Sequence, residues 1–177
     1  MVDGLTAIRT EALDNDRFGT GVDSASVVPC TATHAFAAGP QTTLRHPVQC
    51  SGVGLHCGEL VNLTLKPAPA GTGIRFFRTD VSPSMAWIDG RWDAVTDTTL
   101  CTTIGNANGV RVATVEHLMA ALAAAGVDNV IVELDAAEPP AMDGSAQPFL
   151  FLIKSAGIVI QAEPRAMLRI VKPIRVE

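Results

Sequence analysis

The chain has 177 residues, of which 47% are hydrophobic, and its formal net charge is −5. This length suits one domain with a good core. Aromatic residues make up only 5% and Tyr is absent, so Ala, Val, Leu and Ile must build that core. An acidic chain of this kind is not expected to bind nucleic acid, since that function needs a basic patch.

Targeting and redox signals are weak. No apolar run approaches the roughly 18 residues of a membrane span, and residues 1–5 lack the basic and apolar regions of a secretory signal. The four cysteines form no CxxC pair, which excludes a zinc ribbon. Scattered cysteines in an acidic chain predict free thiols and a cytoplasmic location. These cysteines are Cys30, Cys50, Cys57 and Cys101.

The first part of the chain differs in composition from the rest. Residues 1–42 are rich in Ala, Ser, Thr and Gly and show no sustained hydrophobic period, which predicts a flexible N-terminal extension. We expect His34, which lies here, to be solvated. Order should begin near Thr42, with a strand candidate that Pro47 interrupts.

The next segments favour β-structure. Three glycines within residues 51–58 predict a tight turn or a close approach of the backbone. Residues 60–66 alternate, with Val61, Leu63 and Leu65 on one side, as in a half-buried strand. A further strand is expected over 73–78 and a shorter one over 85–88.

A hairpin is expected to lead directly into a helix. Residues 100–104 and 110–112 are rich in residue types that favour β-strands. They flank a turn that contains Asn108-Gly109, a typical hairpin signal. The following residues, 114–126, predict a helix with Thr114 as its N-cap and Gly126 as its end. Its buried stripe should consist of Val115, Leu118, Met119 and Leu122.

The first turn of this helix carries its only titratable groups, Glu116 and His117. The positive end of the helix dipole favours an anionic Glu and a neutral His. Neutral imidazole is the form that binds a metal. A Glu-His pair alone is a weak signal, but its place in the first turn of an apolar helix strengthens it.

The rest of the chain completes an α+β pattern. Residues 130–134 are apolar and β-branched, as in a central strand. A second helix is expected over 147–156, with Ser145 as its cap, and further strands over 167–171 and from 172 onward. The order predicts an α+β two-layer sandwich, with one mostly antiparallel sheet and two helices packed on one face.

His117 alone would not complete a metal site, because a catalytic zinc needs three protein ligands and an open position. His56 in the glycine-rich turn is a candidate second ligand, but it could instead hydrogen-bond the turn. The Cys101 thiol could also reach the site, although a buried, inert Cys is commoner. A carboxylate such as Glu116 could accept the proton of a metal-activated water as it attacks a carbonyl.

One further carboxylate stands between apolar elements. Asp143 lies in the loop Met142-Asp143-Gly144-Ser145, where it could act in the site or cap local backbone N–H groups as a turn-former. The residue type and its surroundings leave both interpretations open.

Several motifs together resemble one known family, the zinc-dependent UDP-3-O-acyl-N-acetylglucosamine deacetylases of Gram-negative lipid A biosynthesis. They occur in the family's order and cover the chain from about residue 43 to its last residue. The motifs are Gly52-Val53-Gly54-Leu55-His56-Cys57-Gly58, Leu63-Thr64-Leu65-Lys66-Pro67-Ala68, Asp97-Thr98-Thr99-Leu100-Cys101-Thr102, Thr114-Val115-Glu116-His117-Leu118, Gly126-Val127-Asp128-Asn129 and Met142-Asp143-Gly144-Ser145.

The resemblance implies roles for individual residues. Glu116 matches the family's general base, His117 matches one ligand of the Zn²⁺ cofactor, and Cys101 matches a residue near the zinc. His56 and Asp143 fall in matching motifs and are weaker candidates for substrate contact. The implied reaction removes the N-acetyl group from UDP-3-O-acyl-N-acetylglucosamine, the committed step of lipid A biosynthesis.

The resemblance also implies an incomplete site. The family has two similar α+β domains, and its other zinc ligands, a His and an Asp, lie in the second domain with a general-acid His. No His follows His117 in this chain. We therefore expect a first deacetylase domain over 43–171, the start of a missing second domain over 172–177, and little activity of the chain alone. The alternative is a non-catalytic binding or assembly module that kept the fold.

Overall fold

The computed structural model describes residues 39–166 and residue 175. Two predicted segments, the strand over 167–171 and the start of a second domain over 172–177, lie outside the described residues except for Arg175. Most of the predicted N-terminal extension, residues 1–42, also lies outside the described residues. The first described strand begins at Pro40, slightly before the predicted onset of order at Thr42.

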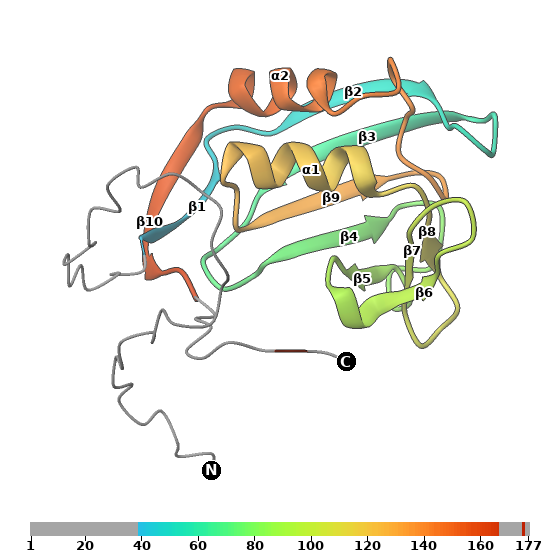
Figure 1. The fold of residues 1–177 in the computed structure, drawn as a ribbon, viewed down its shortest axis with the longest axis horizontal. Helices are drawn as coiled ribbons and strands as arrows, with labels where there is room; N and C mark the ends of the chain where they lie inside the picture. The colour runs from blue at the N-terminus through green and yellow to red at the C-terminus, as the bar shows by residue number, and fades with distance from the viewer. Residues whose placement is uncertain (1–38, 167–174, 176–177) are drawn as a thin grey trace, which may run out of the picture. The chain divides into compact units, whose positions relative to one another are not determined.

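Ten strands, two α-helices and one short 3₁₀ helix make up the described part of the chain (Figure 1). In chain order they are β1 (Pro40–Leu44), β2 (Val48–Val53), β3 (Leu60–Pro67), β4 (Ile74–Arg78), β5 (Trp87–Asp89), η1 (Trp92–Ala94), β6 (Val95–Asp97), β7 (Thr103–Gly105), β8 (Arg111–Val112), α1 (Glu116–Ala125), β9 (Val130–Leu134), α2 (Gln147–Ala156) and β10 (Ile158–Pro164).

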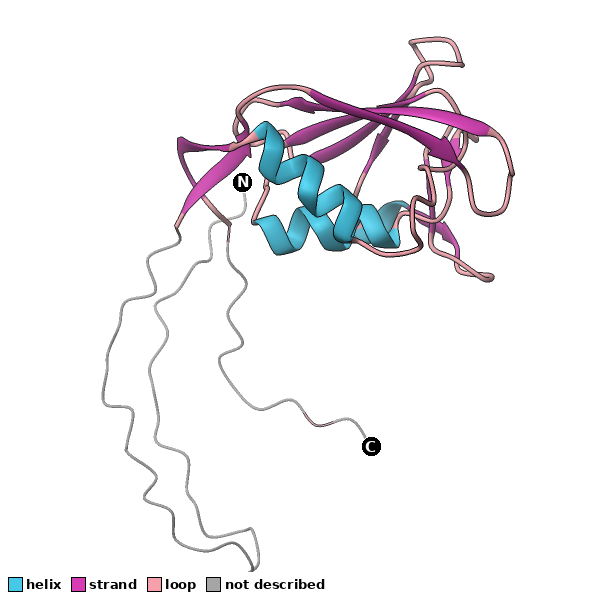
Figure 2. Ribbon diagram, turned by 90° about the horizontal axis from the view of Figure 1, so that it is seen from above, coloured by secondary structure: helices cyan, strands magenta, loops and turns pink. Residues whose placement is uncertain are grey.

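The main sheet has five strands in the order β2-β3-β9-β4-β5. Only the β4–β9 pair is parallel, and the other neighbours run antiparallel. Both helices lie on the same face of this sheet (Figure 2). The predicted fold class, an α+β two-layer sandwich with a mostly antiparallel sheet, is therefore confirmed.

Two smaller sheets accompany the main one. β1 pairs with β10, and β6, β7 and β8 form a three-stranded sheet. The predicted interrupted strand around Pro47 divides into β1 and β2, which belong to different sheets. The predicted hairpin is β7–β8, in which Ile104 faces Val112 and Gly105 faces Arg111. The first residues of the expected strand, 100–102, precede β7 instead of extending it.

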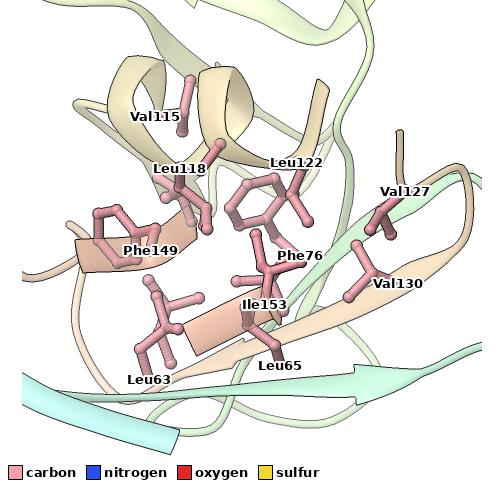
Figure 3. Close-up of a cluster of buried hydrophobic side chains, with 14 of the residues drawn as sticks. Leu63, Leu65, Phe76, Val115, Leu118, Leu122, Val127, Val130, Phe149 and Ile153 are labelled. Atoms are coloured by element: carbon pink, nitrogen blue, oxygen red, sulfur yellow. The ribbon is translucent and has the colours of Figure 1, made fainter. Parts of the chain in front are cut away.

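The core fills the space between the helices and the main sheet (Figure 3). The alternation predicted for β3 is present, since Val61, Leu63 and Leu65 are all buried. β9 is the central strand, as predicted, and its residues alternate between buried and half-buried. Leu118 and Leu122 of α1 pack against the sheet. Phe149 and Ile153 of α2 lie beside them.

Helix ends follow the predictions only in part. Gly126 ends α1 in the left-handed conformation, with φ 71°, as expected for a glycine cap. α2 ends at Gly157 and has a proline in its first turn. Ser145 is not the N-cap of α2, which is Ala146, but its hydroxyl accepts a hydrogen bond from the Gln147 N–H at 3.1 Å.

Candidate active site at the start of helix α1

Glu116 and His117 are the first two residues of α1, where the helix dipole is positive. The predicted N-cap at Thr114 is wrong. The N-cap is Val115, which already has helical dihedrals and makes no capping side-chain bond. Thr114 has φ 53° and turns its hydroxyl toward another segment of the chain.

The Glu116 carboxylate is tied to the loop that precedes β7. Its Oε1 accepts a hydrogen bond from the Thr102 backbone N–H. Burial raises the pKa of Glu116, but hydrogen bonds from Thr102 and from its own amide, with the charge of His117, outweigh burial and lower it. The group is therefore an anion at neutral pH, as a proton acceptor must be.

The same hydrogen bond brings Cys101 close to the helix, because Cys101 immediately precedes Thr102. Cys101 is half-buried, and its Sγ lies 3.9 Å from the Thr103 hydroxyl oxygen. The neighbouring Leu100 has φ 66° and is 90% exposed. The loop thus presents an apolar side chain to solvent beside a free thiol.

His56 is a neighbour of Thr114. Its Nδ1 is 3.1 Å from the Thr114 hydroxyl and 2.9 Å from Oε1 of Glu138. The Glu138 carboxylate also accepts the backbone N–H groups of His56 and Cys57, at 2.9 and 3.0 Å. The possibility that His56 hydrogen-bonds within its surroundings is thus the one that the geometry supports.

Glu138 was not singled out from the sequence, yet its side chain is only 2% exposed. Burial raises its pKa, but hydrogen bonds from Thr114, Cys57 and His56 outweigh burial and lower the pKa to about 2. The one available signal was a glutamate directly before Pro139-Pro140, in a loop between apolar elements. A charged residue at such a place is buried only with several partners.

The glycine-rich turn fits around this carboxylate. A Cβ atom at Gly54 would lie 2.3 Å from the Cys57 Sγ and 2.9 Å from Glu138 Oε2. Real Cβ atoms do not approach other atoms so closely, so this position requires glycine. The close backbone approach predicted for residues 51–58 is confirmed.

Asp143 is exposed, and its Oδ1 accepts hydrogen bonds from the Ser145 hydroxyl and N–H, at 2.8 and 2.9 Å. Both hydrogen bonds lower the pKa of Asp143, and the one from the Ser145 hydroxyl has the larger effect. The charge of His117 lowers it further. These local contacts to Ser145 are those of a turn-forming residue, as one of the two interpretations of Asp143 predicted.

A pocket of about 260 Å³ opens beside Glu116. Its walls are mainly apolar and come from the start of α1, from β6 and β7, and from η1. The side chains that define it include Trp92, Ile104, Val115 and Met119. A carboxylate at the rim of an apolar pocket can hold a polar group of a ligand while the pocket excludes water.

The donors for a metal ion are few. Within residues 39–166 and 175, no three His, Cys, Asp or Glu side chains gather into a group that could hold a metal. A zinc site needs three protein ligands and an open position. The described residues therefore do not form a complete zinc site.

The fold and these contacts define an α+β domain that carries a carboxylate, Glu116, and an imidazole, His117, in the first turn of one helix. A family model described as LpxC: UDP-3-O-acyl N-acetylglycosamine deacetylase matches residues 41–177. The chain therefore belongs to this family, which confirms the resemblance of its motifs.

Curated relatives support the same assignment. Proteins named UDP-3-O-acyl-N-acetylglucosamine deacetylase from Chromohalobacter salexigens, Shewanella halifaxensis and Shewanella oneidensis are 57%, 52% and 50% identical over 137 residues. The match covers 77% of this chain and 44–45% of those proteins. The chain thus spans less than half the length of the curated relatives that it matches. No helix among the described residues is long and apolar enough to cross a membrane.

Proposed function

We propose that this chain supplies one half of a zinc-dependent UDP-3-O-acyl-N-acetylglucosamine deacetylase, with the other zinc ligands contributed from outside the described residues. The observation that carries this proposal is the Glu116–His117 pair at the start of α1, tied to the Cys101 loop, in a chain of the deacetylase family. The reaction would be hydrolysis of the N-acetyl amide with release of acetate, in the cytoplasm, as the composition predicts.

Glu116 is the proton acceptor in this proposal. Its lowered pKa keeps the carboxylate ionised, and the Thr102 N–H holds Oε1 in one direction. The other oxygen, Oε2, is the one that we assign to the proton of the attacking water. General base catalysis of this kind contributes about 10²- to 10⁴-fold to a rate.

His117 would hold one ligand position, and the Cys101 loop would border the reacting group. Asp143 would add negative charge near His117, since the two groups interact electrostatically. The apolar pocket beside Glu116 would exclude water on one side of the carboxylate. These roles use only groups at one end of the domain.

A chimera would test the proposal. Residues 41–177 would replace the matching 137 residues of the Chromohalobacter salexigens relative, and acetate release from the UDP-sugar would be measured. We expect an active chimera whose rate falls about 10²- to 10⁴-fold on Glu116→Gln. A matched control is Glu133→Gln, because Glu133 pairs with Lys66 on the sheet.

A second candidate function is a non-catalytic binding or assembly module, which the lack of a three-donor group among the described residues favours. It predicts an inactive chimera in an experiment where the intact relative is active. Full activity of the Glu116→Gln chimera would contradict the assignment of the general base.

A further inference from the structure

One segment connects the glycine-rich turn with the residues before α1. On one side, the Ala141 N–H donates to the Val53 carbonyl at 2.8 Å, next to a bridge between Gly54 and Pro140. On the other side, the Ala113 N–H donates to the Ala137 carbonyl at 2.8 Å. Residues 137–141 therefore lie between two loops that both contribute to the candidate site.

Glu138 stands at the centre of this segment and gathers donors from both loops. Oε2 accepts the N–H groups of His56 and Cys57, and Oε1 accepts the Thr114 hydroxyl at 2.5 Å and faces His56 Nδ1 at 2.9 Å. All four donors belong to other segments of the chain. A buried carboxylate with four donors has one well-defined orientation.

The charge state of Glu138 determines the tautomer of His56. A carboxylate with a pKa of about 2 is ionised at neutral pH and can only accept hydrogen bonds. The nitrogen that faces it, Nδ1, must therefore carry the proton. A neutral His56 then has its lone pair on Nε2, on a ring whose side chain is 44% exposed.

The backbone at Thr114 needs external support. Its φ of 53° lies in the left-handed region, where a β-branched residue is an outlier. Such a conformation persists only where the surroundings over-determine it. The bonds from Thr114 to Glu138 and from Ala113 to Ala137 supply that support. They fix the chain direction two residues before Glu116.

From these contacts we infer that Glu138 is a positioning residue, which sets the start of α1 through Thr114 and holds His56 as its Nδ1–H tautomer. The geometric part of this inference does not depend on the proposed function. Its catalytic consequence rests on the proposed function. A misplacement of Glu116 by about 1 Å would be expected to reduce turnover on the order of 10²-fold.

The geometric part is tested by NMR on the full chain, without any activity measurement. In the wild type we expect a strongly downfield Thr102 amide proton, from its bond to Glu116, and a ¹⁵N pattern of protonated Nδ1 at His56. Glu138→Gln, which places an amide NH₂ against these donors, should shift the Thr102 signal upfield and redistribute the His56 tautomers. An unchanged Thr102 signal and unchanged tautomers would overturn the inference.

A matched pair separates positioning from general destabilisation. Thr114→Val removes the hydroxyl that Glu138 binds, whereas Thr114→Ser keeps it. We expect the valine variant to shift the Thr102 amide and the serine variant to leave it near the wild-type position. Equal shifts in both would count against the inference, and this pair decides the matter if Glu138→Gln fails to fold. Glu133→Gln should leave the Thr102 and His56 signals in place.

The catalytic consequence is measured in the chimera described above. Glu138→Gln should lower kcat on the order of 10²-fold with little change in KM, because positioning acts on the reacting groups and not on substrate binding. A variant with shifted NMR signals and an unchanged kcat would refute the catalytic role and keep the geometric one. An inactive parent chimera would count against the proposed function and leave the NMR result valid.

Discussion

The main sheet with its two helices and the end of the domain around Glu116 are built in different ways. In the sheet region, β3 buries every second side chain almost completely and both helices cover the same face. At the other end, all three residues of β6 are exposed, and Trp92 and Leu100 are 84% and 90% exposed. Apolar packing holds the first region. The second also buries Ile104 and Val112, but its irregular segments depend on hydrogen bonds between distant loops.

This difference explains how the site is supported. The candidate functional groups lie on short loops and at a helix end, next to exposed apolar side chains such as Leu100. Their geometry depends on a few polar contacts, such as those of Glu138 and Thr102. Rigid scaffolds that carry functional residues on irregular segments are common among proteins. The stability of the domain and the geometry of its site should therefore respond to different substitutions.

The largest effect on stability is expected in the packed region. Phe149 and Phe151 both belong to α2, but Phe149 is 1% exposed and Phe151 is 70% exposed. Phe149→Ala should lower the free energy of unfolding by about 3–5 kcal/mol, because it removes buried contacts and leaves a cavity. Phe151→Ala is the matched control and should change it by less than about 0.5 kcal/mol. Urea denaturation measures both, and similar losses would contradict the comparison.

An intermediate effect is expected from the polar cluster and depends on pH. The pKa of Glu138 is about 2 in the folded chain, below the usual value of roughly 4.3. A carboxyl group with a lowered pKa stabilises the folded state above its unfolded pKa, and this contribution disappears as the pH falls toward 2. The shift corresponds to at most about 3 kcal/mol.

The pH dependence can be isolated with two variants. The difference in unfolding free energy between wild type and Glu138→Gln should be large at neutral pH and should shrink as the pH falls from about 4.3 to about 2. Glu133→Gln, which removes a carboxylate from a partly exposed ion pair, should show a small difference at neutral pH. A wild-type advantage over Glu138→Gln that stays constant down to the lowest pH would argue against an ionised Glu138 as the origin of this stability.

Sequence patterns predicted the packed region well. The alternation of β3, the apolar run of β9 and the spacing of α1 are local signals, and each element was found with nearly the expected bounds. β6 and β10 were missed. β6 has no buried residue to create a pattern, and β10 is defined by its pairing with the distant strand β1.

The polar contacts of the site could not be read from local patterns. Glu138 meets His56 across 82 positions in the sequence and Thr114 across 24. Thr114 was expected to cap the helix that follows it, but its hydroxyl binds the distant carboxylate instead. In the sequence, a threonine that caps a helix cannot be distinguished from one whose hydroxyl binds a distant carboxylate. The motifs singled out Glu116, His117 and Cys101, but Glu138, which binds the Thr114 hydroxyl, was found only in the structure.

The smallest effect should be the same in both regions, because it depends on the local backbone alone. Gly126 ends α1, and Gly109 lies in the β7–β8 turn, with φ values of 71° and 78°. A Cβ at Gly109 would meet no atom within 4 Å, and one at Gly126 would only approach Arg165 at 4.0 Å. Alanine at either position should therefore cost about 1 kcal/mol from backbone strain, without a steric clash. Urea denaturation of the two variants compares the costs. A much larger loss for Gly126→Ala would show that the end of α1 is coupled to the core, and that the contrast between the regions extends to their turns.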